Sequence, residues 1–230
     1  MSTSLIAKFE TARLIPLDDT AKLLDGLYGS GTLIQENARE ARSTAPPDWF
    51  QPWPDYEARA VSLRWYEPTF VPGPLQTEQY AREVLAAGLL TPDEAEERLA
   101  LRLERQAVAL GGDRPPIATF IVDEFALMRG EPATLKEQLD HLVELSKQPR
   151  VFIHVVPRTA GLYVGQSGNF IVASLPGGVD VAYLEDQLSG KVVTDLDLIA
   201  KAVRAWDAIR SVALPRDMSR DLIQRMADEL

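Results

Sequence analysis

The sequence predicts an α+β fold in which a helix-rich domain surrounds a small mixed sheet. Apolar side chains recur every three or four residues in several long segments, bounded by capping residues, glycines or prolines, as in helices. Two short β-branched segments, 117–122 and 151–156, are separated by a helical pattern and predict two strands joined by a helix. Three more strand patterns, 169–174, 179–184 and 191–193, follow at hairpin distances and predict a three-stranded antiparallel meander.

The helices of the main domain follow from the same periodicity. They are expected at 56–65, 76–87 and 92–110, then from 134 to 148, from 195 to 214 and from 216 to 230. Thr91 and Glu94 have the spacing of a capping box, with Pro92 in the first helical position. Pro149 and Pro215 end the helices that precede them.

Three parts are expected along the chain. Residues 1–43 form three short helices, 2–10, 18–28 and 32–41. Residues 44–54 are rich in proline and tryptophan, so they are predicted to be a non-helical strap packed against the protein. Residues 55–230 form the main α+β domain.

Composition indicates an ordinary globular protein. Of the 230 residues, 46% are hydrophobic and 25% are charged. Cysteine is missing, which excludes disulfides, thiolate metal sites and cysteine nucleophiles. The first residues lack the pattern of a signal peptide, and no apolar run approaches the roughly 18 residues of a membrane span. We therefore expect a cytoplasmic protein without a membrane partner.

The net charge argues against strong DNA binding by this chain. It is −10, and acidic residues outnumber basic ones within positions 1–44 as well. Nucleic-acid affinity depends largely on lysine and arginine neutralising phosphates, so DNA is expected to bind weakly or not at all.

Two segments resemble known families. STSLIAKFETARLIP at positions 2–16 resembles the recognition helix and following turn of Xre-type helix-turn-helix proteins. WYEPTFVPGPLQTEQYAR at positions 65–82, with matching residues further along, resembles the C-terminal domain of unknown function 5753 that follows such DNA-binding units. The resemblance implies a transcriptional regulator with a sensor domain.

The first resemblance is incomplete, because the helices that normally precede the recognition helix are missing. It implies a short three-helix remnant, in which Ser2, Thr3, Ser4 and Lys8 would face DNA. Either the natural start lies upstream, or the DNA-binding unit has decayed and serves as a packing or dimer surface. In both cases, apolar side chains that would normally pack on the missing helices favour a homodimer.

No catalytic signature is complete. The GQSGN segment at 165–169 differs from G-x-S-x-G in its last position and precedes no helix, so a turn is favoured over a nucleophilic serine. His154 interrupts a predicted buried strand and is either a core residue or a hydrogen-bonding group in a pocket. No second ligand has the spacing for a metal site, and no cofactor is expected.

Polar and aromatic residues of the family-like segments are the ligand-binding candidates. Asp123 and Glu124 follow a strand, where open sheets tend to bind ligands, and Tyr183 and Glu185 share one face of another. Such a set suits a small cationic or hydroxylated molecule. The structural alternative is that Arg105 forms an ion pair with Glu67 or Glu124. The full set is Trp65, Glu67, Arg105, Gln106, Asp123, Glu124, Gln138, His154, Asn169, Tyr183 and Glu185.

Three functions remain open on the sequence. The first is a ligand- or partner-sensing module of an Xre-family regulator with an incomplete DNA-binding unit. The second is a stand-alone small-molecule binder or biosynthetic enzyme, cyclase-like, that reuses the sensor pocket. The third is a pure protein-interaction module.

Overall fold

The structure is a computed structural model that describes residues 3–11, 14–44, 53–111, 115–185 and 190–230. The chain divides into two compact units, Met1–Asp48 and Trp49–Leu230. The smaller unit contains α1 (Thr3–Glu10), α2 (Asp18–Tyr28) and α3 (Leu33–Thr44), close to the three predicted helices. Ser2 and most of the predicted strap, residues 45–52, lie outside the described residues.

Asp25 joins α2 to α3 in the smaller unit. Its carboxylate accepts hydrogen bonds from the Ser30 hydroxyl (2.6 Å), the Ile34 amide (2.9 Å) and both the backbone and side-chain nitrogens of Gln35. Burial by itself would raise the pKa of Asp25, but these hydrogen bonds lower it to about 2. Gly29 ends α2 in the left-handed conformation, with φ of 65°, which glycine adopts at little cost.

The larger unit confirms the α+β class. The capping box of Thr91 and Glu94 is present, with Pro92 as the first residue of its helix. In chain order the helices and strands are α4 (Trp53–Arg59), β1 (Ser62–Glu67), α5 (Glu78–Ala86), α6 (Pro92–Leu110), β2 (Ile117–Asp123), α7 (Pro132–Leu145), β3 (Val151–Val156), β4 (Phe170–Ser174), β5 (Asp180–Glu185), β6 (Gly190–Val193), α8 (Leu196–Val212) and α9 (Arg216–Asp228).

The sheet has six strands in the order β3-β2-β1-β4-β5-β6. β1, β2 and β3 are parallel, and β4, β5 and β6 continue from β1 as an antiparallel meander. The two predicted strands joined by a helix are the parallel neighbours β2 and β3, and the predicted meander is confirmed. The sequence did not predict β1, which lies between them and joins them into one sheet.

The predicted helix at 56–65 is wrong over most of its length. Trp53 and Pro54, which the sequence placed in the non-helical strap, form the first turn of α4, and α4 ends at Arg59. β1 follows almost at once and is buried over both its faces at Trp65, Tyr66 and Glu67. A central strand buried on both faces lacks the apolar–polar alternation of a half-buried strand, so its pattern does not distinguish it from a helix.

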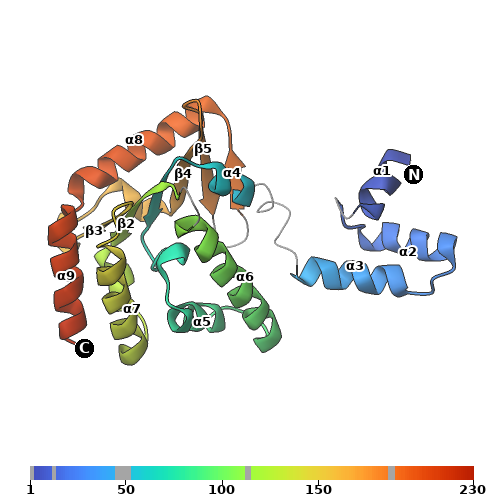
Figure 1. Cartoon of the computed structure of the whole chain (residues 1–230), viewed down its shortest axis with the longest axis horizontal. Coiled ribbons are helices and arrows are strands. Elements are labelled where there is room, and N and C mark those ends of the chain that lie inside the picture. The colour runs from blue at the N-terminus through green and yellow to red at the C-terminus, as the bar shows by residue number, and fades with distance from the viewer. Residues whose placement is uncertain (1–2, 12–13, 45–52, 112–114, 186–189) are drawn as a thin grey trace. The chain divides into compact units, whose positions relative to one another are not determined.

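Helices cover both faces of the sheet (Figure 1), and a hydrophobic core lies on each face. One core packs α4, α5, α7 and α9 against the face that holds Trp65 and Phe120. The other packs α8, through Trp206 and Ile209, against the face that holds Tyr66. Within the described part of the chain, no helix has the length and apolarity needed to cross a membrane.

Candidate functional site

Most of the predicted site residues lie at one edge of the sheet. β1, β2, β3 and β5 run in the same direction, so Glu67, Asp123 and Glu185 lie where three of these strands end. β4 runs the opposite way, which brings Asn169, the residue before it, to the same edge. We call this edge the carboxyl edge.

Glu67, Asn169 and Glu185 form a row across three neighbouring strands, named here the carboxylate row. Asn169 Nδ2 donates to Glu67 Oε2 at 3.1 Å, and Thr69 Oγ1 donates to Glu67 Oε1 at 3.0 Å. Glu67 is only 8% exposed, whereas Glu185 is exposed. Burial raises the pKa of Glu67, and the charge of Glu185 adds to this increase, while the hydrogen bonds from Thr69 and Asn169 oppose it.

Buried aromatic side chains underlie the carboxylate row. Trp65 and Tyr183 precede Glu67 and Glu185 by two residues and therefore lie on the same face of the sheet. The ring of Trp65 lies 6.0 Å from that of Phe120, and Tyr183 stacks on Trp53 at 5.0 Å. Burial raises the pKa of the Tyr183 hydroxyl. The row therefore combines carboxylate oxygens with an aromatic floor.

Arg105 forms a structural ion pair, but not with the partners that the sequence predicted. Its Nε and one terminal nitrogen bind Glu57 of α4 at 2.6 and 3.0 Å, rather than Glu67 or Glu124. Its guanidinium also lies 5.6 Å from the ring centre of Trp65. Because the side chain of Glu57 is only 3% exposed, this pair anchors α6 to α4.

Gln106 and Gln138 hold the segment between β1 and α5. Gln106 Nε2 donates to the carbonyls of Gly73 (2.6 Å) and Gln76 (2.9 Å). Gln138 is fully buried, donates to the Leu75 carbonyl (2.7 Å) and accepts from the Thr77 amide (2.7 Å). Both side-chain amides thus form hydrogen bonds with backbone groups of the loop. This structural role explains the position of the two glutamines without a bound ligand.

Arg102 brings a positive charge beside the carboxylate row. It donates to Gln76 Oε1 at 2.8 Å. Burial and the charge of Arg105 lower its pKa, while the charge of Glu185 opposes this effect. The row is therefore bordered by a cation.

Asp123 belongs to a different network, on the opposite face of the sheet. It accepts hydrogen bonds from the Phe125 amide at 2.9 Å and from the Tyr163 hydroxyl, which in turn lies 2.8 Å from the Tyr66 hydroxyl. Burial raises the pKa of Tyr66 to about 12. A side chain added at Gly165 would lie 2.5 Å from Tyr66 Oη, so this glycine permits the close packing.

Glu124 and His154 lie apart from the carboxylate row. Glu124 accepts a hydrogen bond from the Arg158 amide at 2.8 Å and borders a groove beside α9. His154 Nδ1 is 2.9 Å from the Leu214 carbonyl, and burial lowers the pKa of the imidazole. His154, a half-buried residue of β3, therefore forms a hydrogen bond with the loop that precedes α9.

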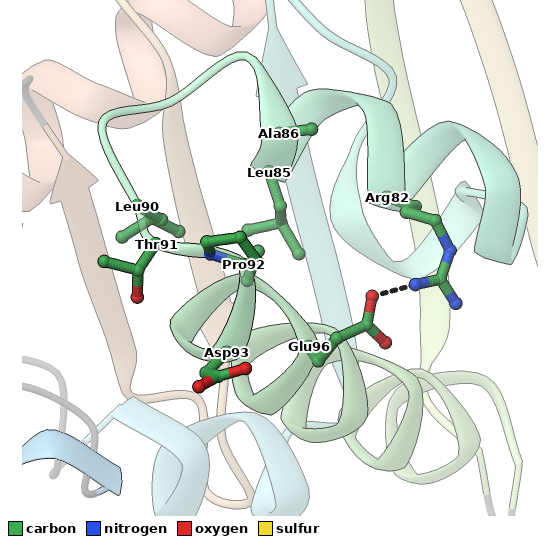
Figure 2. A pocket seen from close by; sticks show the side chains of 9 residues that line it. Arg82, Leu85, Ala86, Leu90, Thr91, Pro92, Asp93 and Glu96 are labelled. Atoms are coloured by element: carbon green, nitrogen blue, oxygen red, sulfur yellow. Dashed lines mark hydrogen bonds and ion pairs between the residues drawn. The ribbon is translucent and has the colours of Figure 1, made fainter.

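A second groove, of about 330 Å³, lies between α5 and the start of α6. Figure 2 shows Arg82 and Glu96 paired across it, with Leu85, Leu90 and Pro92 along its side. None of the predicted ligand-binding residues lines this groove.

The predicted DNA-contact residues lie in the smaller unit. Lys8 is exposed on α1, and Thr3 and Ser4 are part of the same helix. Over the described ranges, no cluster of three or more histidine, aspartate and glutamate side chains could hold a metal ion.

A family model for a domain of unknown function, DUF5753, matches residues 50–225. The chain belongs to the DUF5753 family. The match covers almost all of the larger unit and begins after α3 of the smaller one. A comparison with curated proteins finds no match.

The segment at 65–82 builds the central part of the DUF5753 domain. It supplies the end of β1 with Trp65 and Glu67, then the loop that Gln106 and Gln138 hold, and then α5. The segment at 65–82 therefore contains the first member of the carboxylate row and the loop that follows it.

Sequence reasoning missed several residues of these networks. Glu57 binds Arg105, Gln76 binds Arg102, and Tyr163 binds Asp123. Arg102 lies one turn before Arg105 in a predicted helix, so helical spacing could have identified it. Glu57 had no such signal, because its partner lies 48 residues away.

Proposed function

We propose that the DUF5753 domain is the ligand-sensing module of an Xre-family transcriptional regulator acting in the cytoplasm, and that its carboxylate row binds the ligand. The observation that supports this most is the position of a buried carboxylate, Glu67, beside the exposed Glu185, above aromatic rings. Carboxylates accept N–H and O–H donors. A small amine that also carries hydroxyl groups fits this combination.

Glu67→Gln tests the proposal. Calorimetric titration of the whole chain with glucosamine, spermidine and benzylamine as probes should identify an amine that binds. Glu67→Gln keeps the size of the side chain and removes its charge, so affinity for that amine should fall by about ten-fold or more. Glu144→Gln is the control, because Glu144 pairs with Lys147 on the exposed side of α7. Equal affinities in all three proteins, or binding by none of the probes, would contradict the proposal.

Amine binding should also depend on pH. The pKa of Glu67 is raised from its usual value near 4.5, so the unliganded domain keeps this carboxyl protonated to higher pH. A cationic ligand favours the carboxylate, and binding releases a proton in that range. Affinity should therefore rise with pH up to the raised pKa of Glu67 and then level off. A flat profile, measured by titration at several pH values, would exclude Glu67 as the contact.

Acid–base catalysis is a second candidate for the same site. The raised pKa of Glu67 is the observation that favours it, because a carboxyl that stays protonated at higher pH can donate a proton to a bound molecule. If the bound amine is converted to product, and Glu67→Gln abolishes this turnover, the protein is an enzyme. Binding without turnover favours the sensor.

The smaller unit is proposed to be a helix-turn-helix remnant that forms a homodimer. Leu23 and Leu27 of α2 are 69% and 68% exposed, and Leu17, Tyr28 and Leu33 are also exposed. Such a patch favours association. We expect a dimer by light scattering at about 100 μM, and a monomer for Leu23→Glu/Leu27→Glu, since each buried charge opposes association. A monomeric parent protein would contradict the proposal.

A mobility-shift assay with upstream DNA should show weak binding or none.

A further inference from the structure

A groove of about 420 Å³ lies at the ends of β2 and β3, beside α9. Glu124 follows β2, and Pro157, Arg158 and Thr159 follow β3, so one wall is formed by loops at the carboxyl ends of parallel strands. Ligands of open sheets commonly bind outside these ends. The volume falls within the range of about 300–1,000 Å³ for small-molecule clefts. The other wall is formed by Leu214, Met218, Asp221, Leu222 and Arg225.

The loop wall presents one fixed carboxylate and one available guanidinium. Glu124 is 8% exposed, and its Oε2 accepts the Arg158 backbone amide at 2.8 Å, which fixes its position. Arg158 Nε forms an ion pair with Glu124 Oε1 at 3.6 Å, a distance too long for a hydrogen bond. The exposed guanidinium of Arg158 can therefore still donate hydrogen bonds to another acceptor.

The helix wall repeats this arrangement of charges. Asp221 and Arg225 lie one turn apart on the same face of α9, yet neither side chain has a hydrogen bond or an ion pair among the described residues. On another side of α9, Arg220 and Asp217 are paired at 3.0 Å. The groove therefore has two negative and two positive side chains, of which only Glu124 is nearly buried.

Apolar side chains complete the groove. Met218 is 55% exposed, and Leu214, Leu222 and Pro157 are partly exposed beside it. A ligand with one charge would pair with only two of these four side chains. A molecule that bears both charges complements both pairs, and its apolar part can cover the methionine and leucines.

We propose that this groove binds a zwitterionic molecule of the amino-acid type with an apolar side chain. Arg158 and Arg225 bind the carboxylate, Glu124 and Asp221 bind the ammonium group, and Met218 with its apolar neighbours contacts the side chain. The groove shares no residue with the carboxylate row, so this proposal is independent of the amine site.

A titration monitored by amide NMR tests the chemistry of the ligand. The probes are L-leucine, N-acetyl-L-leucine, which lacks the ammonium group, and L-leucinamide, which lacks the carboxylate. We expect L-leucine to bind with a millimolar dissociation constant and to shift amide signals of Thr159 and Leu222. Each analogue should bind at least about ten-fold more weakly. Equal binding of all three probes, or no shift with L-leucine, would overturn the proposal.

Variants of the two arginines test the location. Arg225→Met and Arg158→Met keep most of the side-chain volume and should each weaken L-leucine binding by about ten-fold. Arg220→Met removes an arginine from the same helix outside the groove and should leave the affinity unchanged. The amide spectra show whether each variant is folded. Undiminished L-leucine binding by folded Arg225→Met and Arg158→Met would exclude this groove.

Discussion

Replacing Arg105 with methionine is expected to destabilise the DUF5753 domain by about 3 kcal/mol. The substitution leaves Glu57, whose side chain is 3% exposed, as a buried charge without its two hydrogen bonds to Arg105. Methionine keeps much of the packing of the arginine stem, so the loss is mainly electrostatic. Thermal unfolding should show a melting temperature about 6–12 °C lower than that of the parent.

Two further variants separate the buried pair from ordinary surface charge. Glu57→Met/Arg105→Met removes both charges together, and it should be more stable than Arg105→Met alone because no buried charge is left unpaired. Arg82→Met, which breaks exposed pairs with Glu78 and Glu96, should cost about 1 kcal/mol or less. An Arg105→Met protein as stable as Arg82→Met would show that the Glu57 pair is not buried.

Gly165→Ala is expected to cost about 2 kcal/mol through overpacking, which lowers the melting temperature by about 4–8 °C. The new methyl carbon would lie 2.5 Å from both Tyr66 Oη and Tyr163 Cε2. Tyr66 is fully buried, and Tyr163 is held by Asp123, so the rings cannot move aside without breaking their hydrogen bonds.

Gly26→Ala is the matched control for the glycine substitution. An added carbon at Gly26, within α2, meets nothing within 4 Å. Because alanine is a better helix former than glycine, this variant should keep or raise the stability of the smaller unit. Unchanged unfolding of Gly165→Ala would mean that the two tyrosines do not pack on this glycine.

Local sequence signals predicted most of the helices and every strand except β1. The capping box and Pro92 mark the start of α6, and short β-branched runs mark β2 and β3. These signals act within a few residues along the chain. β1 could not be found in this way, because α4, α5, α7 and α9 cover one face of the sheet and α8 covers the other. Burial on both faces removes the alternation of apolar and polar residues that marks a half-buried strand.

The candidate site could be predicted only as a set of residue types. Asp123 was chosen because it ends a strand, and Glu185 because it shares a strand face with Tyr183, and the structure places both at the carboxyl edge. It also separates them, since Asp123 binds Tyr163 on one face while Glu185 lies near Glu67 on the other. The sequence could not show this, because the faces depend on a strand that it did not predict.

The sequence by itself determined the α+β class, most element boundaries and the family-like segment at 65–82, because each depends on residues close together in the chain. Only the tertiary structure decided the partner of Arg105, the role of Gln138 as a loop support and the alignment of Glu67 with Asn169 and Glu185. The hydrogen bonds of Arg105 to Glu57 and of Asn169 to Glu67 join residues 48 and 102 positions apart. These contacts form only when the strands pair in the observed register and the observed helices cover the sheet. No pattern of neighbouring residues in the sequence specifies that arrangement.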